Sequence, residues 1–255
     1  METRQEVRLT VDEGIARLTL AAPPLNILTA ALMRELDAAL RRAGEDREVK
    51  AVALAAEGRA FSAGADVGEH RPEQARDMIA AFSALFDTID ALEVPLVAAV
   101  GGAALGAGFE LAMSADIVVA ADSAKFGQPE IRLGFFAPLA VARLPYLVGP
   151  ARAVEITATG RTYTAEEMHR MGLVSRVVPR DGLDAALEEV LADLRRASPL
   201  VMRMNVRRIR AQMRAATEAR HEAERRFLDE LMATEDVREG IASFFEKRAP
   251  QWRNR

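Results

Sequence analysis

Apolar and polar residues alternate over residues 6–11 and again over 15–20, and a short polar turn ending in Gly14 separates the two stretches. A period of two on either side of such a turn predicts a β-hairpin. Residues 49–55 are a short, continuous apolar run, which is typical of a buried strand. The first part of the chain therefore contains three predicted strands.

A helix is predicted between the hairpin and the third strand, because leucines recur at helical spacing over residues 32–40. Thr29 can cap this helix with its hydroxyl group, and Gly44 is expected to end it. Residues 72–93 carry a second apolar stripe at three- and four-residue steps, which predicts another helix. The order of elements is strand, strand, helix, strand, helix.

The centre of the chain combines two apolar runs with a glycine-rich turn. Residues 96–100 and 116–120 predict buried strands. Four glycines lie within residues 101–108, and helical spacing begins directly after them, so Glu110 falls on the first turn of a short helix. Because desolvation of a charged carboxylate costs several kcal/mol, a glutamate in this apolar setting must be paired, hydrated or shifted in pKa.

A second glutamate, Glu130, follows Gln128 and Pro129 in a predicted loop. Each glutamate alone could be an ordinary acid at the start of a helix, where the helix dipole favours negative charge. Two carboxylates in one apolar, glycine-rich frame instead indicate general acid–base chemistry.

The last third of the chain has a mainly helical pattern. Helices are expected over residues 150–159 and 164–171, followed by a short strand over 172–178. Residues 181–249 are helical in pattern almost throughout.

Composition narrows the class of protein. The 255 residues suit one large domain or a domain with a helical appendage. A net charge of -4 gives no general attraction to nucleic acid, and no apolar run has the length of a membrane span. The chain has no cysteine, which excludes disulfides and thiol catalysis, and its first residues lack the apolar core of a signal peptide. A cytoplasmic location is expected.

The residues needed for a metal site, a catalytic triad or a dinucleotide-binding motif are not found together in the sequence. His70, His169 and His221 are scattered among unrelated segments, so neither a metal cluster nor a Ser-His-Asp triad is predicted. We expect these histidines to be structural or at the surface. The segment around Gly106 lacks the third glycine of a dinucleotide-binding fingerprint.

Three segments resemble the enoyl-CoA hydratase/isomerase family, the crotonases. They are AFSAGADV at residues 60–67, ALGAGFELAMSADIVVAADSAKFGQPEIRLG at 104–134 and EGIASFFEKRAP at 239–250. The three occur in the family's order and spacing. The resemblance implies an α/β fold with a β-β-α spiral core over residues 1–196 and a C-terminal helical oligomerisation region over 197–255. In the family, such regions form homotrimers, which usually pair into hexamers. The resemblance implies neither a membrane nor a nucleic acid as a partner.

The resemblance also implies roles for individual residues. The N–H groups of Ala65 and Ala107 would form an oxyanion hole for the thioester oxygen, in which each donor contributes roughly 3 kcal/mol. Ala107 departs from the family's usual glycine, but only its N–H is needed. Glu110 would orient and activate a water molecule, and Glu130 would transfer the proton at carbon. The remaining residues implied in binding substrate or coenzyme A are Ala63, Gly64, Asp66, Val67, Gly106, Phe136 and Lys247.

The implied activity is hydration of a double bond conjugated with a CoA thioester, without a metal or redox cofactor, since coenzyme A is part of the substrate. The alternative within the family is enoyl-CoA isomerisation, which usually needs only one carboxylate. Phe135, Phe136, Pro138 and Leu139 replace a glycine-rich turn of linear-chain hydratases. This departure resembles the subgroup that hydrates cyclohexa-1,5-diene-1-carbonyl-CoA, although it could also be a core substitution without bearing on the substrate.

A hypothesis of another class comes from residues 195–217, which carry seven arginines and no acid. Phosphate contacts need such clusters, so an RNA-binding protein of crotonase fold is the alternative. The stretch lacks the aromatic residues on which bases stack.

Overall fold

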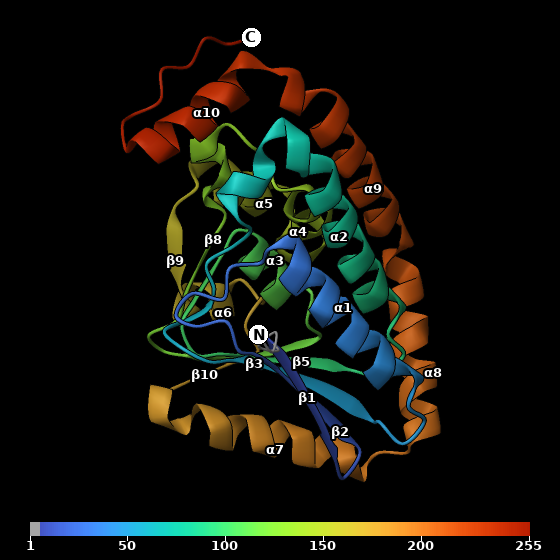
Figure 1. Ribbon diagram of the computed structural model, residues 1–255. Coiled ribbons are helices and arrows are strands. Elements are labelled where there is room, and N and C mark those ends of the chain that lie inside the picture. Colours follow the sequence, from blue (N-terminus) through green and yellow to red (C-terminus); the bar gives the residue numbers. More distant parts are fainter. Residues whose placement is uncertain (1–5) are drawn as a thin grey trace, which may run out of the picture.

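A six-stranded sheet forms the base of the computed structural model, which describes residues 6–255 (Figure 1). The strands lie in the order β1-β2-β3-β5-β7-β10; β1 and β2 pair antiparallel as the predicted hairpin, and the other neighbours pair parallel. The strands are β1 (Val7–Asp12), β2 (Ile15–Leu20), β3 (Ala51–Ala56), β5 (Leu96–Val100), β7 (Ile117–Ala121) and β10 (Arg176–Val178).

A smaller sheet of four strands was not predicted. Its order is β4-β6-β8-β9, with only β9 antiparallel. Each strand has three residues, too few for a periodic pattern. They are β4 (Ala60–Ser62), β6 (Ala103–Leu105), β8 (Lys125–Gly127) and β9 (Thr162–Thr164).

Ten α-helices and five 3-10 helices are found within residues 6–255. The α-helices are α1 (Ala30–Glu45), α2 (Pro72–Ala91), α3 (Ala107–Met113), α4 (Pro138–Val148), α5 (Pro150–Thr159), α6 (Ala165–Arg170), α7 (Leu183–Arg196), α8 (Pro199–Arg210), α9 (Arg214–Asp229) and α10 (Glu235–Glu246). The 3-10 helices are η1 (Val67–His70), η2 (Pro129–Leu133), η3 (Arg180–Gly182), η4 (Ala211–Met213) and η5 (Leu231–Ala233).

The connections between these elements form a spiral. The chain passes from β3 in the large sheet to β4 in the small sheet and then to α2; it repeats this step as β5, β6 and α3, and again as β7, β8 and η2. This is the β-β-α spiral that the resemblance implied. Each turn places a loop between the two sheets at the same end of the molecule.

Two expectations about helices need correction. Thr29 caps α1 by accepting a hydrogen bond from the N–H of Leu32, but the helix continues past Gly44 to Glu45. Gly44 packs close to Leu92 and lies inside the helix, so it does not act as the terminating glycine. No helix was expected directly after Glu130, yet α4 begins at Pro138.

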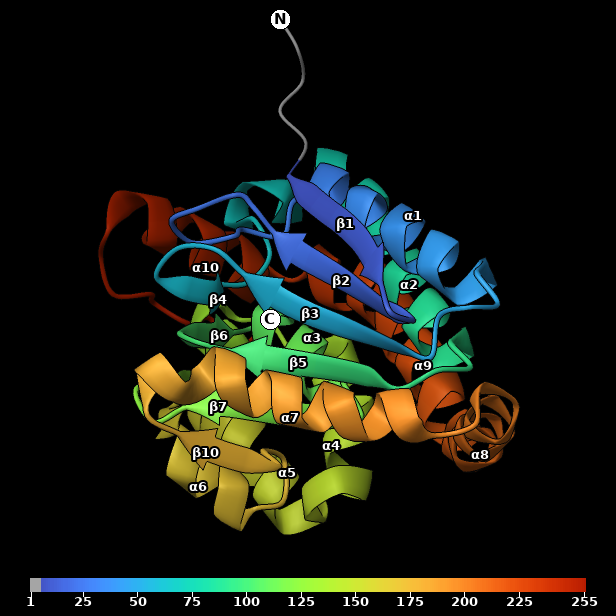
Figure 2. The same ribbon diagram turned by 90° about the horizontal axis from the view of Figure 1, so that it is seen from below.

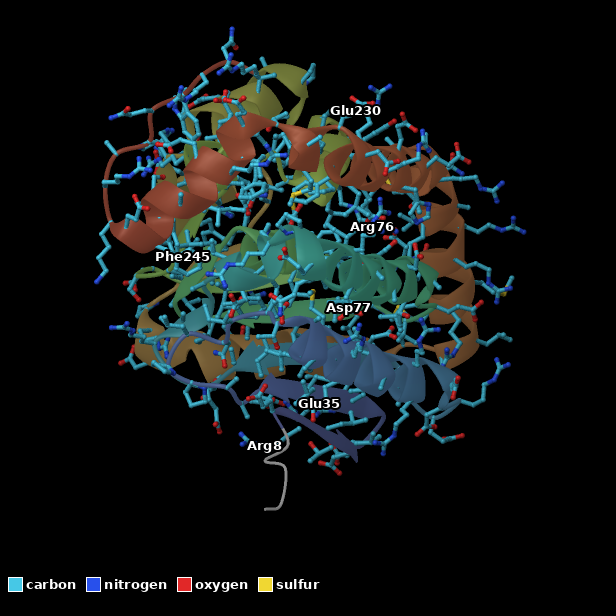
Figure 3. The ribbon with its side chains drawn as sticks, turned by 45° about the horizontal axis from the view of Figure 1, so that its top comes forward. Arg8, Glu35, Arg76, Asp77, Glu230 and Phe245 are labelled. Carbon is cyan, nitrogen blue, oxygen red and sulfur yellow. The ribbon has the colours of Figure 1, made fainter. Side chains whose placement is uncertain are left out.

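The helices cover the large sheet unequally. Helix α7 lies alone across one face, where Leu183, Leu187 and Leu191 pack on strand residues such as Val97 and Val119 (Figure 2). The other face carries the main core, to which α1, α2 and α3 contribute (Figure 1). Arg76 and Asp77 point outward from α2 (Figure 3). Glu35 of α1 instead accepts hydrogen bonds from the N–H groups of Glu6 and Val7 (3.0 Å each). In the part of the chain that is described, no helix combines the length and apolar character needed to span a membrane.

The C-terminal helices pack on the body of the same chain. Helix α9 runs along α2 and α4, and its Arg220 is fully buried, where it pairs with Glu224 and Asp87. The arginine-rich segment is largely paired within the chain as well: buried Arg203 donates to the carbonyls of Asp46 (2.8 Å) and Val49 (2.9 Å). Helix α7 ends at residue 196, where the boundary between core and helical region was predicted. That boundary stays a prediction.

Candidate active site

Glu110 lies on the first turn of α3, as predicted, and only 2% of its surface is exposed. Its Oε1 accepts a hydrogen bond from the N–H of Ala140 (2.9 Å) at the start of α4. Burial raises the pKa of Glu110 to about 8, and the neighbouring charge of Glu130 adds to the rise, whereas hydrogen bonds from the N–H groups of Ala140 and Leu139 oppose it. The carboxyl group is therefore held in place and readily protonated.

Glu130 lies on the first turn of the 3-10 helix η2. Its Oε2 is buried and makes no hydrogen bond to any residue of the described range 6–255. Burial raises the pKa of Glu130 to about 7. A buried polar atom without a partner is rare in proteins and commonly has a functional reason. Because the two carboxyl groups interact, they titrate as a pair that can both give and take a proton near neutral pH.

Both glutamates face one small cavity. Its volume is about 30 Å³, roughly the space that one water molecule occupies in the liquid. The wall is mostly aliphatic and aromatic, and consists of Ala65, His70, Met78, Ile79, Phe82, Ala107, Glu110, Glu130, Phe135, Phe136, Ala137, Pro138 and Phe227. A larger hollow of about 610 Å³ lies between α1, α2 and Arg203 and contains neither glutamate.

Hydrogen bonds to carbonyl oxygens orient the two peptide groups that carry the N–H of Ala65 and the N–H of Ala107. The carbonyl of Gly64 accepts a hydrogen bond from Leu28 (2.9 Å), and the carbonyl of Gly106 accepts hydrogen bonds from two N–H groups inside α3 (2.8 and 2.9 Å). In a trans peptide the N–H points away from the carbonyl oxygen. The N–H groups of Ala65 and Ala107 are thus turned away from those partners, and both residues line the cavity.

At Gly106 the backbone passes close to the carboxyl group of Glu130. Its φ of 55° and ψ of -129° are accessible to glycine but strained for other residues, and a Cβ added here would lie 2.4 Å from Oε1 of Glu130. Gln128, which is 1% exposed, was not predicted as a site residue. With its amide nitrogen facing the carbonyls of Gly106 and Gly127, it donates to both (2.9 and 3.2 Å). Gln128 thereby helps to fix the peptide that carries the N–H of Ala107.

Other predicted binding residues stabilise the loop that carries Ala65. The N–H of Ala63 donates to the carbonyl of Leu25 (2.9 Å), and Asp66 accepts a hydrogen bond from the N–H of Gly68 (2.6 Å) as it caps η1. Val67 is the first residue of η1. These contacts hold the loop that presents Ala65.

Lys247, predicted as a coenzyme A contact, is exposed after the last turn of α10 and does not line the cavity. Two residues earlier, Phe245 lies under the guanidinium group of Arg71, 4.9 Å from ring centre to Cζ, and Figure 3 shows it on the outside of α10. The end of α10 therefore lies beside the segment that follows Ala65.

His70 and Phe227 were not predicted as site residues, yet both line the cavity. His70 is held by a hydrogen bond to the carbonyl oxygen of Asp66, which agrees with the structural role expected of it. Phe227 reaches the same wall from α9, and its ring stacks on Phe135 with centroids 5.6 Å apart. No local pattern identifies either residue, because both are brought in by tertiary packing.

Replacing Glu110 by glutamine is expected to stabilise the protein at alkaline pH. The pKa of this carboxyl group is raised on folding, so its contribution to stability is fully present at low pH and is lost as the pH rises through about 8. Glutamine has no such dependence. Relative to the wild type, the variant should gain on the order of a few kcal/mol at pH 9 compared with pH 4, measured by denaturant unfolding. An equal stability difference at both pH values would contradict the raised pKa.

The chain is similar to known proteins in both sequence and structure. The sequence profile of the family described as Enoyl-CoA hydratase/isomerase matches residues 10–255. The chain is 39% identical to the cyclohexa-1,5-dienecarbonyl-CoA hydratase of Thauera aromatica over 98% of this chain and 97% of the relative. It is 37% identical to a probable enoyl-CoA hydratase of Mycobacterium bovis over 99% and 100%. The crystal structure of an enoyl-CoA hydratase from Mycobacterium avium subsp. paratuberculosis superposes with a TM-score of 0.88 at 28% identity, covering 98% and 99%.

Proposed function

The chain belongs to the enoyl-CoA hydratase/isomerase family, and from this premise we propose that it is an enoyl-CoA hydratase. Such a lyase adds water to a double bond conjugated with a CoA thioester, or removes it in reverse. The observation that carries the proposal is that Glu110 and Glu130 line one cavity together with Ala65 and Ala107.

In the proposed reaction, the N–H groups of Ala65 and Ala107 bind the thioester oxygen. As water adds to the β-carbon, negative charge moves onto that oxygen, and two aimed donors stabilise it more strongly than they stabilise the neutral carbonyl. The orientation of the two peptide groups supports this role. No metal or redox cofactor is part of the proposal, because the reaction consists of proton transfers and addition of water.

The two glutamates would share the proton transfers. Glu110, held by the N–H of Ala140, would orient the water and help to take its proton as the oxygen bonds to the β-carbon. Glu130, which has a buried oxygen without a protein partner, would deliver a proton to the α-carbon. The raised pKa values of the pair support this exchange near neutral pH.

The alternative within the family is isomerisation of the double bond, which needs only one carboxylate as a proton shuttle. Two buried carboxyl groups in one cavity favour hydration. The test is to incubate the pure protein with crotonyl-CoA, a long-chain enoyl-CoA and cyclohexa-1,5-diene-1-carbonyl-CoA and to follow the loss of conjugated absorbance. A 3-enoyl-CoA is incubated separately, and a gain of conjugated absorbance there, without addition of water to any of the other three thioesters, would favour the isomerase.

The aromatic wall favours a compact, flat acyl group. The ring of Phe136 lies at 84° to that of Phe227, with centroids 5.8 Å apart. Phe136 also lines a second cavity of about 120 Å³, whose wall shares Glu130, Phe135 and Ala137 with the first. We therefore propose a cyclic dienoyl-CoA as the preferred substrate, in line with the name of the relative from Thauera aromatica.

Phe136→Ala is expected to reduce the preference for the cyclic dienoyl-CoA over crotonyl-CoA by about three- to tenfold in kcat/KM. The change removes an aromatic ring that lines both cavities, and each methylene of the substrate ring that loses apolar contact forfeits about 0.8 kcal/mol. Val11→Ala, at an exposed position on β1, is the matched control. The cyclic assignment fails if crotonyl-CoA is the better substrate of the wild type, whereas the hydratase assignment survives that result.

We further propose that the chain assembles as a homotrimer or a dimer of trimers through residues 197–255. Leu200, Val201, Met204 and Ile209 of α8 are exposed apolar side chains on that region, which supports the proposal. The cytoplasmic location stays a prediction of the sequence.

A further inference from the structure

His70 is the third polar side chain in the wall of the active-site cavity, after the two glutamates. The hydration proposed above does not use it. Every other side chain of that wall is aliphatic or aromatic, so His70 introduces a polar group into a surface that otherwise suits a hydrocarbon. Such a group costs binding energy unless it meets a partner on the ligand.

The backbone fixes which nitrogen of His70 is free. Its Nδ1 lies 2.8 Å from the carbonyl oxygen of Asp66. A carbonyl oxygen only accepts, so Nδ1 carries the hydrogen, and in the neutral ring Nε2 is an acceptor. Burial lowers the pKa of His70 and favours this neutral form, although the hydrogen bond to Asp66 acts in the opposite direction.

Packing holds the imidazole ring in place. It lies against Phe135, with centroids 4.8 Å apart, and against Phe227 at 6.1 Å. Within the described residues 6–255, no hydrogen bond to Nε2 is found. An acyl group that covers this nitrogen without donating to it would leave an unpaired acceptor, at a cost of about 1–3 kcal/mol.

We propose that Nε2 of His70 accepts a hydrogen bond from a hydroxyl group on the acyl part of the thioester. His70 thus selects hydroxylated acyl groups over plain hydrocarbon ones of the same shape. The inference rests on the proposed function and narrows its substrate class. This hydroxyl group has one of two sources. Either the hydration reaction adds it, or the substrate already carries it as a substituent.

The test measures calorimetric binding of three prepared thioesters to the full-length protein. These are cyclohex-1-ene-1-carbonyl-CoA, its 4-hydroxy derivative, and the hydration product of cyclohexa-1,5-diene-1-carbonyl-CoA. The matched variants are His70→Met, which keeps a similar volume without a nitrogen acceptor, and His70→Gln, whose amide oxygen can replace Nε2. Unfolding midpoints establish that both variants are folded.

In the wild type, at least one hydroxylated ring should bind about tenfold more tightly than the plain ring, the fold-change expected when a buried acceptor gains a partner. His70→Met should bring this ratio close to one, and His70→Gln should restore most of it. Tighter binding of the hydration product identifies the reaction as the source of the hydroxyl, and tighter binding of the 4-hydroxy ring alone identifies a substituent.

The inference is overturned if the wild type binds all three rings equally, if the ratio survives in His70→Met, or if both variants weaken every ring alike. The last result would assign His70 to packing only. Because binding is measured directly, none of these outcomes requires turnover, and binding of the 4-hydroxy ring is compared without its hydroxyl group taking part in the reaction. If the wild type hydrates no thioester, the proposed function fails. The binding measurements still decide whether the site selects a hydroxyl group.

Discussion

Glu110→Gln and Glu130→Gln are each expected to lower the turnover of hydration by at least about a hundredfold. Glutamine keeps the shape of the side chain, so the hydrogen bond from Ala140 to position 110 can persist. It cannot take up or release the proton that the carboxyl group exchanges. Binding of the CoA thioester should change little, because the oxyanion donors and the aromatic wall remain.

The measurement is steady-state kinetics, together with the dissociation constant of a saturated acyl-CoA. Glu166→Gln, an exposed glutamate on α6, is the control and should leave both quantities unchanged. If one active-site variant kept near-normal turnover, hydration by two carboxylates would be wrong. Incorporation of solvent deuterium at the α-carbon would then show which proton transfer remains.

Gly106→Ala is expected to lower turnover by a hundredfold or more, because it disturbs two parts of the site at once. The new methyl group would lie 2.4 Å from Oε1 of Glu130 and must displace that carboxylate. Alanine at this φ and ψ is also strained, by roughly 1–3 kcal/mol, so the peptide that carries the N–H of Ala107 should turn. Misplacement by about 1 Å can cost a hundredfold in rate.

Gly182→Ala is the matched control, since its φ is -90° and no neighbouring atom lies within 4 Å of the added methyl group. Turnover and the unfolding midpoint are measured for both variants. Turnover within threefold of the wild type in Gly106→Ala would show that the close approach of Gly106 to Glu130 does not matter for the reaction.

Much of this architecture was predicted from local patterns. The hairpin, helices α1 and α2 and the buried strands β5 and β7 have clear periodicity or continuous apolar runs, and all were confirmed. The positions of Glu110 and Glu130 could be inferred because a charge within an apolar, glycine-rich stretch conflicts with simple burial. A conflict of this kind is itself a signal of function.

Other features depend on contacts between distant segments. The strands of the small sheet are too short to show a period, and they form because the spiral brings β4, β6 and β8 side by side. Position 70 follows an ordinary loop, and position 227 lies on a charged, amphipathic helix, so neither sequence context indicates a place beside the glutamates. Only the packing of η1 and α9 around the same space brings them there.

The contribution of α9 to the cavity has a consequence for biosynthesis. A ribosome makes the glutamates and the loop of Ala65 before it makes Phe227, which belongs to the same cavity wall. Because chains tend to fold from the N-terminus as they emerge, a nascent spiral would hold its two carboxyl groups beside an open, hydrated gap. We therefore expect the cavity wall to be complete, and the site competent, only after α9 has been synthesised and has packed on the spiral.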